Sequence, residues 1–94
     1  MIAPVDAAVA IAAMNAKGFI ETRTGRKDRM FHLHVNGVKT NFWVKVSHGA
    51  KEIRRDEIRN NVRPFGIPGD ALYKILCCEY DRAETLEVWQ NRNR

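Results

Sequence analysis

Two stretches in the middle of the chain place every second residue on the same side, which is the period of a half-buried β-strand. In the first stretch the expected core-facing residues are Phe31, Leu33 and Val35. In the second they are Val38, Thr40, Phe42, Val44 and Val46. Asn36 and Gly37 separate the stretches with the residue pair that favours a two-residue turn. The pattern therefore predicts one antiparallel hairpin with an apolar face.

The other face of this hairpin carries a different set of side chains. It consists of Met30, His32, His34, Lys39, Asn41, Trp43 and Lys45. Cations suit a phosphate backbone, and an aromatic ring suits a stacked base. This face is therefore a candidate nucleic-acid surface. In the alternative interpretation, another element covers Trp43 and the lysines are ordinary solvated strand residues.

A helix and a further strand are predicted before the hairpin. One helical stripe holds Val5, Ala8, Val9, Ala12 and Ala16. Pro4 is tolerated in the first turn, and Gly18 marks the end. The small alanine side chains would let this helix lie close to a sheet. Residues 19–23 are typical of a first strand, and residues 24–28 of a polar connection.

A short basic helix is predicted after the hairpin. Its inner stripe is Ile58, Val62 and Phe65, and Pro64 with Gly66 ends it near Phe65. A separate ridge holds Arg55, Arg59 and Arg63 at four-residue spacing. The ridge could grip phosphates. Alternatively, it is a solvated face that Asp56 and Glu57 partly neutralise.

The last part of the chain predicts helical cover for the core. Pro68 can begin a helix whose inner residues are Leu72, Ile75 and Leu76. Asp81 and Glu84 have the spacing of a capping pair for a last helix, which carries Leu86 and Trp89. Cys77 and Cys78 are adjacent, so we expect a reduced, partly buried helix end without a disulfide or a metal.

Length and composition predict one globular domain, since the chain has 94 residues, of which 45% are hydrophobic and 29% charged. We divide it into an αβββα core, residues 1–67, and a helical extension, residues 68–94. The formal net charge of +5 favours an anionic partner, although charge also serves solubility. No run approaches the roughly 18 apolar residues of a membrane helix, and residues 1–16 lack the pattern of a signal peptide. We expect a cytoplasmic protein without contact to a membrane.

Several short motifs together resemble the HicA family of bacterial toxins. They are Lys17-Gly18-Phe19, Arg23, the hairpin, His48-Gly49, Lys51-Glu52-Ile53, Ile58-Arg59 and Phe65-Gly66-Ile67. The similarity spans residues 8–67. It implies an α-β-β-β-α fold similar to a double-stranded-RNA-binding domain, RNA as ligand, mRNA cleavage and a HicB-like antitoxin as partner. Residues 76–89 also resemble the extension of a less characterised HicA-like subgroup.

The chain departs from the family at the expected catalytic position. Aligned without gaps from Gly18, the family's Gly-Ser-His falls on Arg26-Lys27-Asp28, so Asp28 replaces the catalytic histidine. An aspartate is a poor acid for a leaving 5′-oxygen, whereas a histidine titrates near the working pH. No family catalytic residue is therefore carried over here.

Three histidines are the remaining catalytic candidates. His32 and His34 lie about 7 Å apart if they share one strand face, so one could act on a 2′-hydroxyl. His48 matches a family histidine and could instead orient the turn before the basic helix. Two histidines without a third ligand make a weak metal site, so we expect no metal and no cofactor.

These observations predict an α+β domain with a three-stranded antiparallel sheet, helices on one face and one or two extra C-terminal helices. The leading hypothesis is an RNA-binding, HicA-like protein with reduced or absent nuclease activity. Its predicted RNA contacts are Arg26, Lys27, His32, His34, Lys39, Trp43, Lys45, Lys51, Arg55 and Arg59. The alternatives are an active mRNA interferase that uses His32, His34 or His48, and an interaction or inhibitor module that binds an acidic protein. Exposure of Leu86, Val88 or Trp89 on the last helix would favour a homodimer.

Overall fold

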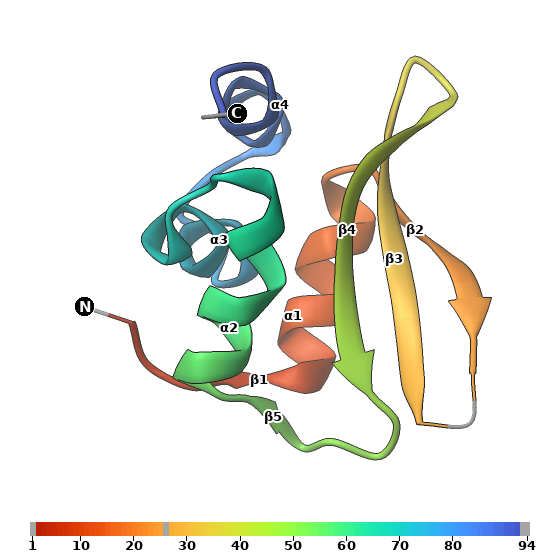
Figure 1. Cartoon of the computed structure of the whole chain (residues 1–94), viewed down its shortest axis with the longest axis vertical. Helices are drawn as coiled ribbons and strands as arrows, with labels where there is room; N and C mark the ends of the chain where they lie inside the picture. Colours follow the sequence, from red (N-terminus) through yellow and green to blue (C-terminus); the bar gives the residue numbers. More distant parts are fainter. Residues whose placement is uncertain (1, 26, 93–94) are drawn as a thin grey trace.

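The computed structural model describes residues 2–25 and 27–92. The elements are β1 (Val5–Asp6), α1 (Ala7–Ala16), β2 (Phe19–Thr24), β3 (Asp28–Val35), β4 (Val38–Ser47), β5 (Glu52–Ile53), α2 (Arg55–Val62), a 3-10 turn (Arg63–Phe65), α3 (Gly69–Leu76) and α4 (Arg82–Gln90). The expected α+β class is confirmed (Figure 1).

The main sheet is antiparallel and has the order β2-β3-β4. The predicted hairpin is β3–β4, and its turn residues Asn36 and Gly37 have positive φ angles of 53° and 78°. Two positive φ angles match the twist of the flanking strands, which is why an Asn-Gly pair favours this turn. A separate two-stranded sheet pairs β1 with β5 through Val5 opposite Ile53.

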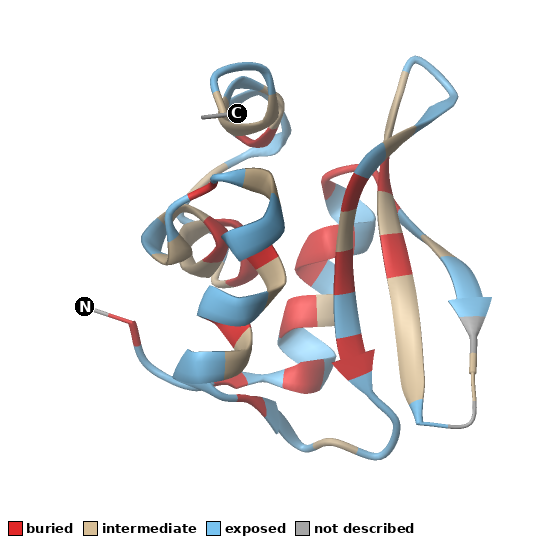
Figure 2. Ribbon diagram, viewed as in Figure 1, coloured by how far each residue is buried: buried red, intermediate tan, exposed pale blue. Residues whose placement is uncertain are grey.

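The core lies between the main sheet and the helices, which stand on one side of it (Figure 1). Side chains of the hairpin's apolar face are buried there, and Figure 2 shows buried positions on β3 and β4 alongside those of α1. The buried side chains of this apolar face are Phe31, Leu33, Phe42, Val44 and Val46. Val38 is an exception, because it is 67% exposed where we expected it in the core. It lies beside the turn, opposite Val35, at the end of the hairpin that extends past α1 (Figure 1).

The predicted inner face of α1 was wrong. Its buried residues are Ala7, Ala10, Ala13 and Met14, whereas Ala8, Val9, Ala12 and Ala16 are exposed. Val5 is buried, but as part of β1. The helix begins only at Ala7, after Asp6 accepts a hydrogen bond from the Val9 backbone N–H at 3.1 Å. A helix rich in alanine has little difference in hydrophobicity between its faces, so the spacing of its apolar residues does not determine which face packs.

The later helices follow the predicted pattern. Gly66 adopts a left-handed conformation with φ 67° after the 3-10 turn and stops the basic helix, as expected. Asp81 and Glu84 form a reciprocal capping box at the start of α4. Cys77 is partly buried and Cys78 exposed, and both are free thiols. Over the described residues, no helix is long and apolar enough to cross a membrane.

Helix α4 completes the core of its own chain. The Trp89 ring stacks on the fully buried Phe42, with centroids 5.3 Å apart and planes inclined by 16°. Trp89 also meets Phe65 edge to face at 6.1 Å. The extension therefore covers one edge of the αβββα core. Leu86, Val88 and Trp89 are each partly buried.

Candidate nucleic-acid interface

The face of the sheet that points away from the helices is open (Figure 1). Its side chains come from the three strands: Ile20, Thr22, Met30, His32, His34, Lys39, Asn41, Trp43 and Lys45. We call this set the open sheet face. A register shift between Glu21 and Arg23 also places Arg23 opposite Met30. The register aligns Ile20, His32 and Trp43 in one row across the sheet, and it places Lys39 opposite His34 and Lys45 opposite Met30. The strands therefore gather the predicted histidines, lysines and tryptophan on one surface.

His32 is held at the centre of this surface. Its Nδ1 lies 2.5 Å from the Thr22 hydroxyl on the neighbouring strand. Burial lowers the pKa of His32, and the charges of Lys39 and His34 lower it further. The ring therefore favours its neutral form more than a free histidine does, and the Thr22 contact fixes its orientation.

His34 is oriented by a backbone contact. Its Nδ1 lies 2.9 Å from the carbonyl oxygen of His32, so Nδ1 carries the donated proton and Nε2 is left for other partners. Lys39 stands across the hairpin from it. Both histidines thus belong to the open sheet face, as predicted.

Trp43 is neither fully open for a stacked base nor fully covered by another element, which were the two interpretations of the sequence. It is half-buried, and its ring meets Phe65 edge to face at 6.0 Å, so the end of the basic helix covers part of it. The rest lines a hollow of about 270 Å³ between β4 and α2. Partial cover limits the freedom of the ring and leaves part of its surface for a ligand.

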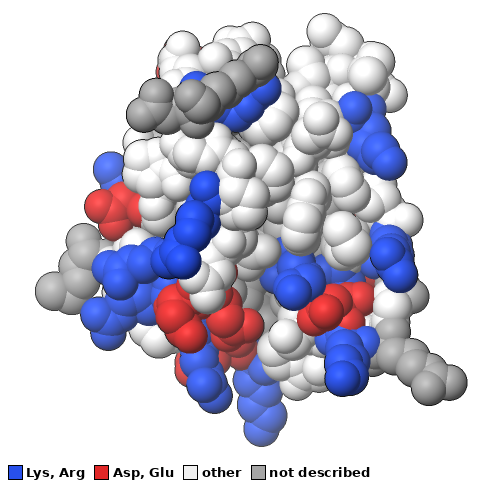
Figure 3. All heavy atoms as spheres, viewed as in Figure 1, with Lys and Arg blue, Asp and Glu red and all other residues white. Residues whose placement is uncertain are grey.

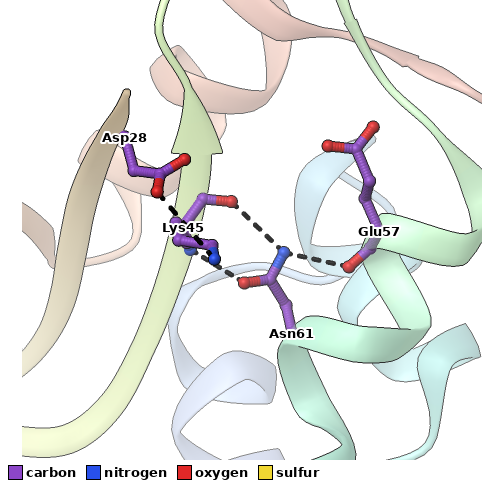
Figure 4. Close-up of polar contacts among 4 residues, drawn as sticks. All are labelled: Asp28, Lys45, Glu57 and Asn61. Atoms are coloured by element: carbon purple, nitrogen blue, oxygen red, sulfur yellow. Dashed lines mark hydrogen bonds and ion pairs between the residues drawn. The ribbon is translucent and has the colours of Figure 1, made fainter. Parts of the chain in front are cut away.

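Asn61 joins α2 to the free edge of β4 (Figure 4). Its Oδ1 accepts from the Lys45 backbone N–H at 2.8 Å, and its Nδ2 donates to the carbonyl oxygens of Lys45 at 3.2 Å and Glu57 at 2.9 Å. Lys45 Nζ also lies 3.9 Å from an oxygen of Asp28. The side chains of Asp28 and Lys45 are 37% and 52% exposed, so water screens this ion pair and makes it weak.

The arginine ridge lies apart from the open sheet face. Arg55 and Arg59 border a shallow hollow with Pro4, Glu52, Arg54 and Asp56. The Arg59 stem packs beside Gly69 at the start of α3, whereas Glu57 and Asn61 of the same helix border β4. Figure 3 shows Lys and Arg side chains over both the helices and the strands, with Asp and Glu side chains among them. The predicted cations therefore form two surfaces.

The remaining predicted residues lie at the loops. Arg26 is outside the described residues. Lys27 is exposed, and its carbonyl oxygen accepts from the His48 backbone N–H at 2.7 Å. His48 and Lys51 are exposed in the connection after β4. His48 follows Ser47, which pairs with Asp28 at the end of the hairpin, whereas His32 pairs with Trp43 further along the strands. His48 therefore lies apart from His32. Within residues 2–25 and 27–92, no group of three or more His, Cys, Asp or Glu could hold a metal ion.

Sequence reasoning missed three features of this region. Thr22 and Ile20 alternate with Phe19 and Glu21, so the same two-residue period could have placed them on the open sheet face. The link from Asn61 to Lys45 had no signal in the sequence. The third is a hollow of about 460 Å³ beside the hairpin tip, lined by Lys17, Leu33, His34, Val35, Asn36, Gly37, Arg82, Ala83 and Leu86.

Comparison with protein-family models, curated proteins and solved structures found no match for this chain.

Proposed function

We propose that this protein binds RNA through its open sheet face. The observation that carries the proposal is the juxtaposition of Lys39, Trp43 and Lys45 with two histidines on the sheet face opposite the helices. Lysines attract the phosphate backbone, and the tryptophan offers a ring on which a base can stack. Imidazole N–H groups add hydrogen bonds to phosphate or sugar.

The resemblance to HicA toxins is a second reason to propose RNA as the ligand. The order α1, β2, β3, β4, α2 follows the α-β-β-β-α order that the family and the double-stranded-RNA-binding domain share. In this proposal the chain is a divergent HicA-like protein, and its partner is RNA, with a HicB-like antitoxin as a second partner. Asp28 at the expected catalytic position makes binding the primary activity.

The test is a filter or mobility assay with the variant Lys39→Ala/Trp43→Ala/Lys45→Ala. We expect it to lose RNA retention at moderate salt. The matched control is Arg55→Ala/Arg59→Ala/Arg63→Ala, which removes more charge from the other cationic surface and should retain binding. Because Trp43 contacts Phe65, circular dichroism must show that the first variant is folded. Equal loss in both variants would indicate general charge attraction and reject the open sheet face.

A variant that keeps Trp43 separates electrostatics from stacking. Lys39→Ala/Lys45→Ala removes two cations, so the slope of log affinity against log salt should become shallower by about 1.4 for single-stranded RNA. An unchanged slope would show that neither lysine contacts phosphate.

The short contact between Thr22 and His32 favours a second candidate function, metal-free RNA cleavage. In the tautomer in which Nδ1 donates to the Thr22 hydroxyl, Nε2 of His32 carries the lone pair and can take the proton of a 2′-hydroxyl. The 2′-oxygen then attacks phosphorus, and protonated His34 gives its proton to the leaving 5′-oxygen. The products are a 2′,3′-cyclic phosphate and a 5′-hydroxyl.

Cleavage is tested by incubating RNA with the protein in excess chelator. A cyclic-phosphate product that disappears in both His32→Ala and His34→Ala, while binding persists, would establish it. Cleavage that survives either change would come from another group or from a contaminating nuclease.

A further inference from the structure

The hollow between β4 and α2 has the chemistry of a nucleobase subsite. It is lined by Asp28, Trp43, Lys45, Ser47, Glu57, Asn60, Asn61 and Pro64. Its volume of about 270 Å³ lies just below the roughly 300–1,000 Å³ of sites that enclose drug-sized ligands, which suits one base. An aromatic wall, amides and carboxylates are the groups with which proteins read unstacked RNA bases.

Some polar side chains of this hollow are already held by hydrogen bonds within the protein, and others are not. Asn61 is committed to the Lys45 and Glu57 backbones, and Glu57 Oε1 accepts from the Arg54 backbone N–H at 3.1 Å as part of the helix cap. Among the described residues, the Asp28 side chain contacts a polar partner only through its 3.9 Å ion pair with Lys45. The Asn60 side chain is exposed and makes no hydrogen bond to the described part of the chain. Asp28 and Asn60 are therefore the carboxylate and the amide that can read a ligand, and the Ser47 hydroxyl lies in the same hollow.

The Asp28 carboxylate and the Asn60 amide together determine which base fits. A carboxylate accepts two hydrogen bonds from a pair of adjacent donors. Only guanine has such a pair, N1–H and the N2 amino group, beside an O6 acceptor for an amide N–H. Adenine, cytosine and uracil each place an acceptor next to their donor on this edge, and that acceptor would face the carboxylate unfavourably.

We propose that this hollow binds one guanine of a single-stranded RNA segment, with Asp28 accepting from the guanine N1–H and N2–H and Asn60 donating to O6. Trp43 supplies the wall on which the base packs, and Lys45 binds the adjoining phosphate. The proposal rests on the RNA-binding function above and deepens it by naming the base that is read. It also gives a role to Asp28 at the position where the family has its catalytic histidine.

The test measures fluorescence anisotropy of labelled short oligouridines that carry a single central guanine, adenine, cytosine or uracil. Wild-type protein should prefer the guanine oligonucleotide by about tenfold, the discrimination typical of one bidentate contact. Asp28→Ala should reduce this preference to less than about twofold. Because the change also frees Lys45 from its ion pair, affinity for the adenine, cytosine and uracil oligonucleotides should rise, so the ratio of guanine affinity to theirs is the quantity that decides.

Matched variants keep the outcome interpretable. Asp70→Ala removes an exposed carboxylate on α3 and should leave the preference intact. Asn60→Ala should weaken the preference without unfolding the chain, because its side chain is exposed. Binding of all four oligonucleotides with equal affinity would overturn the guanine subsite and leave RNA binding standing. If none of the four binds, the proposed function itself fails.

Discussion

Asn61 on α2 pairs with the backbone of Lys45 as a further β-strand would, accepting from its N–H at 2.8 Å and donating to its carbonyl oxygen at 3.2 Å. The free edge of β4 is thereby occupied near its C-terminal end by one side chain. Edge strands expose unpaired backbone groups that invite pairing with other chains, and covering them is a common protection. The same contact fixes the width of the hollow between β4 and α2.

Asn61→Ala should lower the free energy of unfolding by about 1–3 kcal/mol, because hydrogen bonds to Lys45 and Glu57 are lost together. Urea denaturation measures the change. Asn60→Ala is the control, because the Asn60 side chain is exposed and the hydrogen bonds to Lys45 and Glu57 come from Asn61. Equal stabilities of the two variants would show that water replaces Asn61 without cost.

Gly18 is required where α1 turns into β2. It has φ 97°, and a Cβ atom there would lie 3.2 Å from the His34 carbonyl oxygen. Gly18→Ala should therefore cost about 1–3 kcal/mol of unfolding free energy. Gly37→Ala is the matched comparison, because Gly37 also has a positive φ of 78° but faces open space. The thermal midpoint should fall further for Gly18→Ala, and the reverse order would contradict the crowding argument.

Trp89 is the residue through which α4 covers the core. Trp89→Ala removes a ring stacked on the buried Phe42 and in contact with Phe65, so we expect a loss of about 3 kcal/mol. Glu87→Ala, an exposed position of the same helix, should change stability little. Dye binding to newly exposed apolar surface would check that Phe42 is uncovered. A stable, dye-negative Trp89→Ala variant would show that α4 contributes little to the core.

The sequence predicted those elements whose signal is local. Alternation and the Asn36–Gly37 pair specify the hairpin, and Asp81 with Glu84 specifies the start of α4, because each depends on residues within a few positions. The face of α1 was mispredicted because alanines contrast too little. The two-residue strands β1 and β5 were missed because their pairing is long-range and their pattern is too short to read.

The candidate site also has some features that a local sequence pattern predicts and others that depend on how the elements pack. Strand alternation alone is enough to place His32, Trp43 and Lys45 on one face of the sheet. The sequence also predicted that Arg55 and Arg59 form a ridge, but its position relative to the sheet depends on how α2 rotates against β4. The hollow beside Asn61 depends on that rotation too, and no local pattern specifies it.

The last prediction concerns pH and His32. Burial and the charges of Lys39 and His34 lower its pKa, so the unfolded chain binds this proton more readily than the folded one. Stability should therefore be greatest above the ordinary histidine pKa near 6.5, and should fall as the pH drops from there through the folded pKa. A bound phosphate adds negative charge beside the ring and so favours protonated His32. RNA binding should therefore strengthen as the pH falls through the same range, with uptake of a proton. His32→Gln should flatten both profiles, measured by urea denaturation and by anisotropy across the pH range. If His32→Gln left both profiles as steep as in the wild type, other groups would be responsible for the pH response.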